Sequence, residues 1–253
     1  MWITKDSVYE LYNEYKIEKN CTELPNFDLD ISYSVGALAM FKLDELLEEN
    51  YILHINHLIS TYEDIYTKSI LYHEFTHFYD FINMKDKMST ENIEYFMRTY
   101  SEYHASQEEI SFQINHIHLK SVNDKVFYKS KEKCDIYDYL TDPLSIVMNE
   151  MNKERGAYKN MTELEVETKF HYTEKALFYY LGKLSIAHKR FPNDVKDMIP
   201  TINPVFSNDM NQIKIILDLS SNIEDTVELL GKCLDGFNRD FILYFKYGEK
   251  PIG

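Results

Sequence analysis

The pattern that most constrains this chain is His73-Glu74-Phe75-Thr76-His77, an H-E-x-x-H motif inside a largely apolar and aromatic segment. On a helix, residues four apart lie on the same face, so the imidazoles of His73 and His77 can bind one ion. Glu74 follows the first histidine directly and can reach a water molecule at that ion. The motif therefore predicts a helical Zn²⁺ site with Glu74 as its catalytic residue.

The segments around the motif predict a strand followed by two long helices. Residues 51–59 combine alternating polarity with β-branched side chains, which is typical of a strand. A helix is expected from a cap at Ser60 or Thr61 to about residue 84, and a second one, capped by Ser89 or Thr90, over 91–116. We also expect a helix over 6–19, a strand or helix over 36–43, a loop or hairpin over 120–134, and helices over 145–155, 162–190, 210–219 and 223–245.

Composition and charge limit the classes of protein to which this chain can belong. The 253 residues include 21 Tyr and 15 Phe but only 7 Gly and 6 Pro, which indicates a compact chain with a sizeable core. A formal net charge of -15 argues against nucleic acid and anionic membranes as partners. Three widely spaced cysteines, no long apolar run and no signal-like start predict free thiols and a soluble, cytoplasmic protein.

A catalytic zinc ion usually has three protein ligands and one open position, so a third ligand must be found. The candidates are Asp80, on the motif helix, and Glu102 and His104, on the next helix. Glu102 lies 25 residues after His77, which lets the first helix end and the second return antiparallel to it. Glu102 is the preferred ligand and His104 the alternative, while Asp80 either orients a ligand imidazole or faces solvent.

Together with the segment Ser101-Glu-Tyr-His-Ala-Ser-Gln-Glu-Glu109, the H-E-x-x-H motif resembles the gluzincin metallopeptidases. The order of strand, motif helix and E-x-x-A helix is similar to the small gluzincins of the ImmA/IrrE type, often found near phage and mobile-element genes. The resemblance covers roughly residues 36–114 and implies a zinc site of His73, His77 and Glu102. It also implies a strand at the rim of the cleft, for which 51–59 is the candidate, that pairs with an extended substrate. The thermolysin branch has an acid where this chain has Ser106.

These observations predict an α+β, predominantly helical fold with a small β-sheet packed on the H-E-x-x-H helix. Residues 1–120 are expected to form a zincin-like catalytic domain, and residues 121–253 a helical C-terminal extension packed on it. The expected function is that of a zinc-dependent metallopeptidase acting on a peptide or protein substrate, in which Glu74 activates the zinc-bound water. The alternative is a regulatory or interaction protein of a phage or mobile element that retains the fold without general proteolysis.

Peptide hydrolysis also needs a hydrogen-bond donor or a cation that stabilises the negative charge developing on the carbonyl oxygen. The sequence offers several candidates without choosing among them, and each is also explained by packing or exposure: Tyr72, Tyr100, Tyr103, His104, His116 and His118.

Overall fold

The computed structural model describes residues 3–32, 37–117, 119, 121–129, 132–195, 198, 202–219 and 222–250. Its N-terminal part contains α1 (Lys5–Glu18), β1 (Asp28–Ser32), β2 (Ala39–Phe41), α2 (Leu43–Leu47), β3 (Ile52–Asn56), a 3₁₀ helix (His57–Thr61), α3 (Asp64–Met84), α4 (Thr90–Phe96), a π-helical turn (Met97–Ser101) and α5 (Glu102–His116). The rest contains β4 (Phe127–Lys129), β5 (Glu132–Cys134), α6 (Ile136–Met151), α7 (Glu163–Arg190), α8 (Pro204–Leu219), α9 (Ile223–Ile242) and a second π-helical turn (Leu243–Tyr247).

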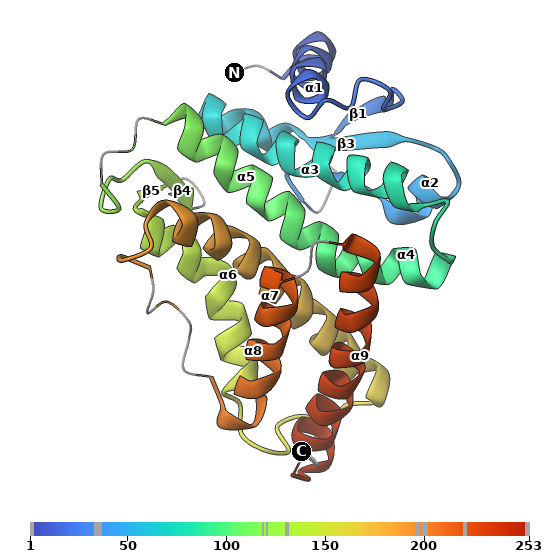
Figure 1. Cartoon of the computed structure of the whole chain (residues 1–253), viewed down its shortest axis with the longest axis vertical. Helices are drawn as coiled ribbons and strands as arrows, with labels where there is room; N and C mark the ends of the chain where they lie inside the picture. The colour runs from blue at the N-terminus through green and yellow to red at the C-terminus, as the bar shows by residue number, and fades with distance from the viewer. Residues whose placement is uncertain are drawn as a thin grey trace.

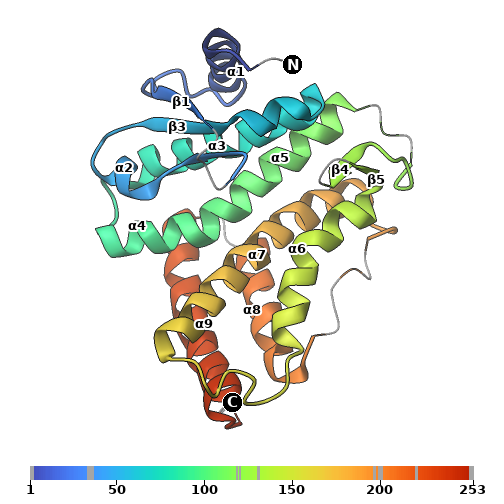
Figure 2. The ribbon, with the colours of Figure 1, turned by 180° about the vertical axis from the view of Figure 1, so that it is seen from behind.

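The predicted α+β, predominantly helical fold is confirmed. Figure 1 shows α1, the sheet and α3 at one end of the molecule and α6 to α9 at the other, with α5 between them. Seen from behind, α3 and α5 again run side by side across the middle (Figure 2). The two helices of the predicted metal site are therefore direct neighbours inside the fold.

The small sheet is mixed and has the strand order β1-β3-β2, with β3 parallel to β1 and antiparallel to β2. It packs on α3 through aromatic side chains, for example Phe41 of β2, which stacks on Phe78 with ring centroids 4.8 Å apart. The strand predicted over 51–59 is present as β3 but ends at Asn56. Because β3 is paired on both sides, the expectation that it binds an extended substrate is wrong, and β2 is the described edge strand on that side.

The helix predicted over 91–116 is interrupted by the π-helical turn Met97–Ser101, directly before Glu102. A π-helical turn carries one residue more than an α-helical turn, so it rotates the following side chains about the helix axis. Here it separates α4, capped by Ser89 as predicted, from α5. The interruption sets which face of α5 is turned towards α3.

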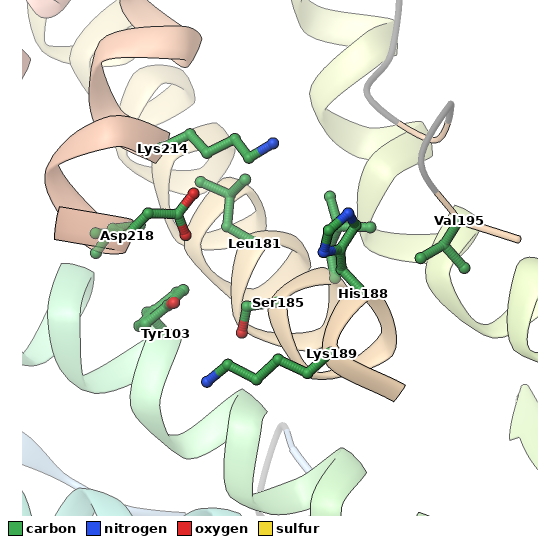
Figure 3. Close-up of a pocket in the computed structure, with 10 residues that line it drawn as sticks. Tyr103, Leu181, Ser185, His188, Lys189, Val195, Lys214 and Asp218 are labelled. Carbon is green, nitrogen blue, oxygen red and sulfur yellow. The ribbon is translucent and has the colours of Figure 1, made fainter. Parts of the chain in front are cut away.

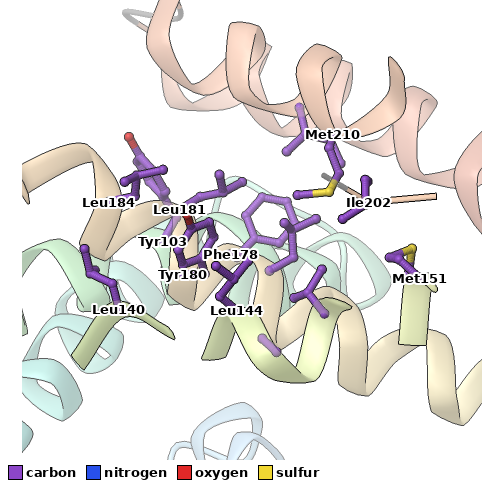
Figure 4. Close-up of a cluster of buried hydrophobic side chains, with 14 of the residues drawn as sticks. Tyr103, Leu140, Leu144, Met151, Phe178, Tyr180, Leu181, Leu184, Ile202 and Met210 are labelled. Atoms are coloured by element: carbon purple, nitrogen blue, oxygen red, sulfur yellow. The ribbon is translucent and has the colours of Figure 1, made fainter. Parts of the chain in front are cut away.

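The buried apolar side chains form two clusters. One joins α1, the sheet, α3 and α4, and includes Tyr12, Phe75 and Phe78. The other is formed mainly by α6 to α9, and its centre around Phe178 and Tyr180 is shown in Figure 4. α5 contributes to both clusters, with Phe112 in the first and Ile110 in the second. The division of the chain at residue 120 stays a prediction.

The helix boundaries differ from the predictions mainly where capping decides them. Thr4 caps α1, which begins at Lys5, one residue before the predicted start, and α3 begins after Glu63 without a side-chain cap. α6 begins at Ile136, contains Pro143 and is capped by Asp135, so the helix predicted over 145–155 begins nine residues earlier than expected and ends at Met151. Cys21, Cys134 and Cys233 are free. Of the described helices, none is both long and apolar enough to cross a membrane.

Helices α5 and α7 approach each other closely at Gly182 of α7. A Cβ atom at this position would lie 2.2 Å from the carbonyl oxygen of Tyr103 and 2.9 Å from the Cβ of Ser106, both on α5. A side chain larger than hydrogen therefore cannot be accommodated without moving one of the helices. This contact brings the N-terminal half of α7 over the start of α5, where Glu102 lies.

Candidate metal centre

The structure brings together the three ligands that the sequence predicts. His73 and His77 lie one turn apart on α3, and Glu102 begins α5. His77 Nε2 is 3.0 Å from His73 Nε2 and 3.4 Å from Glu102 Oε1, and His73 Nε2 is 3.8 Å from Glu102 Oε2. All three side chains are buried, and their ligand atoms lie within 4.8 Å of one another. This His-His-Glu group can hold a metal ion.

The contacts around the two imidazoles fit a shared cation. Ser101 donates its hydroxyl proton to Asp80 Oδ2 (2.8 Å), so its oxygen accepts a proton from His77 Nδ1 (2.8 Å). His73 Nδ1 lies 3.2 Å from the carboxylate oxygen Glu109 Oε2, an ion-pair contact without hydrogen-bond geometry, and the negative charge of Glu109 favours a proton on that nitrogen. With both protons on Nδ1, the two Nε2 lone pairs face each other at 3.0 Å, an arrangement that a shared cation stabilises. Among the described residues, Glu102 Oε2 and His73 Nδ1 both belong to the few buried side-chain atoms without a hydrogen-bond partner.

Asp80 lies behind His77 and acts on it through Ser101. Its Oδ1 accepts a hydrogen bond of 2.9 Å from His104 Nδ1, while Oδ2 binds Ser101. His104 thus faces Asp80 and does not belong to the metal-binding group, whose third member is Glu102. Burial disfavours the charge on His104, but Asp80 outweighs it and raises the pKa of that imidazole.

Glu109 holds His73 from the other side, and the sequence analysis assigned it no role. It lies two turns after Glu102 on α5 and is itself held by a short hydrogen bond of 2.5 Å from Tyr139, one of 2.7 Å from Tyr179, and Lys183 Nζ at 3.0 Å. Burial alone would raise the pKa of Glu109, but Lys183 and His73 pull it far below its usual range. The carboxylate is therefore charged and fixed beside His73.

Helix α7, in the C-terminal half of the chain, places three side chains against this centre at intervals of four residues: Lys175, Tyr179 and Lys183. Tyr179 contacts His73, with ring centroids 5.5 Å apart, in addition to its bond with Glu109. Lys175 Nζ lies 2.6 Å from Glu102 Oε1. Burial would raise the pKa of Glu102, but Lys175 and then His77 hold it well below its usual range. The C-terminal half, for which the sequence predicted no chemistry, thus contacts the metal-binding group directly.

Glu74 faces the same space from the side of the sheet. Its Oε2 accepts a hydrogen bond of 3.2 Å from the backbone N–H of Phe41, in β2. Burial raises the pKa of the Glu74 carboxyl, and the two histidines offset part of that effect. A cavity of about 190 Å³ opens beside Glu74 and His73, lined by Leu38, Ala39, Tyr66, Ile70, His73, Glu74, Glu109 and Tyr179. It is bounded by β2 on one side and α7 on the other.

The side chains that the sequence offered to stabilise the negative charge on the substrate's carbonyl oxygen have other partners or line another cavity. Tyr72 donates to Glu18 at 3.1 Å, His116 Nδ1 donates to the Phe112 carbonyl at 2.8 Å, and His104 binds Asp80. Tyr100 stacks on Phe96, and His118 lies outside the described residues. Tyr103 lines a different cavity of about 360 Å³ between α5, α7 and α8, together with His188 and Lys214 (Figure 3).

Two sequence signals could have pointed to the missing residues. Glu109 lies seven residues after Glu102, which places both carboxylates on one face of a helix. Lys183 stands among apolar residues in the core-facing stripe of a long helix, and lysine is almost never fully buried unless it is paired. Neither signal identifies its partner from sequence alone.

Comparisons of this chain with protein-family models, with curated proteins and with solved structures find no match.

Proposed function

We propose that the protein is a zinc-dependent metallopeptidase that hydrolyses peptide bonds. The observation that carries this proposal is the convergence of His73, His77 and Glu102 beside the buried carboxylate of Glu74. Two neutral imidazoles and one carboxylate form a common ligand set of catalytic zinc, whereas Mg²⁺ prefers oxygen ligands alone. Three protein ligands leave one position for water or substrate.

A bound zinc ion would supply Lewis-acid chemistry, by lowering the pKa of a water molecule and polarising the carbonyl group of the substrate. Glu74 then accepts a proton from the attacking water as the new carbon–oxygen bond forms, and delivers a proton to the leaving nitrogen as the carbon–nitrogen bond breaks. Burial raises the pKa of Glu74, which suits a group that must both take and return a proton. The bond from Phe41 N–H holds Oε2 in place.

The surroundings of Glu74 support an extended peptide as substrate. β2 is a described edge strand, and an extended chain can add to such an edge through backbone hydrogen bonds. The neighbouring cavity of about 190 Å³ is lined partly by Leu38, Tyr66 and Ile70, so we expect a preference for an apolar side chain next to the scissile bond.

The test is a digest of a peptide library by the zinc-loaded protein, read by mass spectrometry, with Glu74→Gln as the key variant. We expect Glu74→Gln to keep one zinc ion per chain but to lose roughly 10²–10⁴-fold in rate, because the general base is removed. Glu94→Gln, a change of the same kind at an exposed position of α4, should behave as wild type. Cleavage that survives Glu74→Gln would refute the proposal. Tight binding of one partner without cleavage would favour a regulatory protein of a phage or mobile element.

A further inference from the structure

Lys175 is the cationic side chain of α7 that contacts the metal-binding group directly. Its Nζ is 2.6 Å from Glu102 Oε1, the same oxygen that lies 3.4 Å from His77 Nε2. The ammonium group therefore sits at the edge of the space that the three ligand atoms enclose. The side chain is 58% exposed, so its stem approaches this space from solvent and has room to change direction.

We propose that Lys175 is a catalytic residue, which stabilises the negative charge that develops on the carbonyl oxygen during hydrolysis. This inference rests on the proposed function. A water molecule that attacks the carbonyl carbon turns the carbonyl oxygen into an anion, and a preorganised cation or N–H donor lowers the barrier to that step. Lys175 provides such a cation within the centre.

Glu74 and Lys175 approach the metal-binding group from different elements of the fold. Glu74 is bound to Phe41 of β2, whereas Lys175 belongs to α7, one turn before Tyr179, the residue of α7 that lines the cavity beside Glu74. A peptide that lies along β2 would thus place its carbonyl group between the base and the ammonium group.

The other two side chains of this face of α7 have different tasks. Tyr179 donates its hydroxyl to Glu109 Oε2, and Lys183 is buried with its ammonium group on Glu109 Oε1. Both hold the carboxylate that orients His73. Of the three, Lys175 has the exposed stem that lets it follow the substrate.

The ammonium group and a divalent cation at Glu102 repel each other, because both positive charges approach the same carboxylate. We therefore expect Lys175 to leave Glu102 as the ion binds and to turn towards the substrate position. This exchange separates a catalytic role from a structural one. A residue that merely holds Glu102 would strengthen metal binding, whereas Lys175 competes with the metal for that carboxylate.

The experiment compares Lys175→Met and Lys175→Arg with the wild type. Lys169→Met is the control, because Lys169 is an exposed lysine of the same helix. Zinc affinity is measured by competition with a chromogenic chelator, and kcat and KM on the peptide that the wild type cleaves fastest. We expect Lys175→Met to lose roughly 10²–10³-fold in kcat, with KM changed less than about threefold. Its zinc affinity should equal or exceed that of the wild type, Lys175→Arg should recover part of kcat, and Lys169→Met should match the wild type.

A kcat of Lys175→Met within about threefold of the wild type would overturn the inference. So would a loss of zinc affinity of about tenfold, which would show that Lys175 supports Glu102 instead. A wild-type protein that binds zinc but cleaves no peptide would refute the proposed function, and the role of Lys175 with it. Cleavage that needs Glu74 but not Lys175 would refute the role of Lys175 alone.

Discussion

At the scale of single residues, each ligand imidazole is fixed by a partner outside the H-E-x-x-H motif. His77 is held by Ser101 and Asp80, and His73 by Glu109. Such partners set the tautomer and direction of a metal-binding histidine, and their loss typically weakens metal binding 10- to 100-fold. The metal centre therefore extends well beyond the three ligands.

Replacement of Glu109 by Gln should lower zinc affinity by about 10- to 100-fold, because His73 loses the carboxylate that holds its Nδ1 proton. The variant also leaves the buried ammonium group of Lys183 without its counter-charge, so a loss of folding stability is expected as well. Chelator competition measures the first effect and urea denaturation the second. Unchanged zinc affinity in a folded Glu109→Gln protein would show that Glu109 does not orient His73.

Replacement of Ser101 by Ala tests the other imidazole. The change removes the hydroxyl group that connects His77 to Asp80 and leaves the Nδ1 proton of His77 unpaired. We expect about a tenfold loss of zinc affinity, measured in the same competition assay. Ser111→Ala, on α5 and away from the ligands, is the control. Equal affinities for the two variants would contradict the proposed role of Ser101.

At the scale of secondary-structure elements, the centre is built by three helices and one strand. α3 supplies the two histidines and Glu74, α5 supplies Glu102 and Glu109, α7 supplies Lys175, Tyr179 and Lys183, and β2 binds Glu74 through the N–H of Phe41. The position of α7 depends on its close contact with α5 at Gly182.

A Gly182→Ala substitution should therefore disturb the site from a distance. The added methyl group would lie 2.2 Å from the Tyr103 carbonyl oxygen, so α7 must move away from α5. We expect a loss of about 1–3 kcal/mol in the free energy of unfolding, together with weaker zinc binding. Gly231→Ala in α9 is the matched control, since nothing lies within 4 Å of a Cβ atom there. The control should be neutral or stabilising by up to about 1 kcal/mol, because alanine favours a helix. Identical stabilities for the two variants would refute the argument.

The elements themselves could largely be predicted from sequence, because apolar periodicity reports which face of a helix is buried. That signal predicts the helix of the motif and the long helix over 162–190, present as α3 and α7. It cannot report the π-helical turn before Glu102, since one inserted residue barely disturbs the apolar pattern. The short strand β1 was missed because its pairing with β3 joins segments that are far apart in sequence.

The candidate site also has a part that the sequence predicts and a part that it does not. His73, Glu74 and His77 share one helix, so their geometry follows from local spacing, and Glu102 required only the next helix to return antiparallel. Lys175 and Lys183 contact α5 from more than 70 residues further along the chain. Which face of α7 meets α5 is set by packing at Gly182, and no local pattern in the sequence contains that information.

At the scale of the whole molecule, the candidate metal site lies where the two hydrophobic clusters meet. α3 belongs to the first cluster and α7 to the second, and the ligand helix α5 packs against both. A metal ion held by α3 and α5 should thus stabilise the fold as a whole, because it binds the native arrangement and not the unfolded chain.

Removal of the metal should therefore lower the thermal stability of the protein. A free ligand concentration of 1,000 times its Kd contributes about 4.1 kcal/mol of stability, and each kcal/mol shifts Tm by about 2–4 °C in a chain of this size. Calorimetry of the zinc-loaded and chelator-treated protein should thus show a difference of roughly 10 °C. A Glu102→Ala variant should show a much smaller shift on zinc addition. The same large shift in that variant would mean that zinc binds elsewhere.

The measurement that tests the central claim most directly is the metal content of the purified protein. Elemental analysis of the wild type, purified without chelator, should find about one zinc ion per chain, as expected for a single site with three protein ligands. The variants His77→Ala and Glu102→Ala should retain about a tenth of that or less, since each loses one of the ligands that α3 and α5 bring together. A folded wild-type protein without stoichiometric zinc, or variants that retain it in full, would contradict the account.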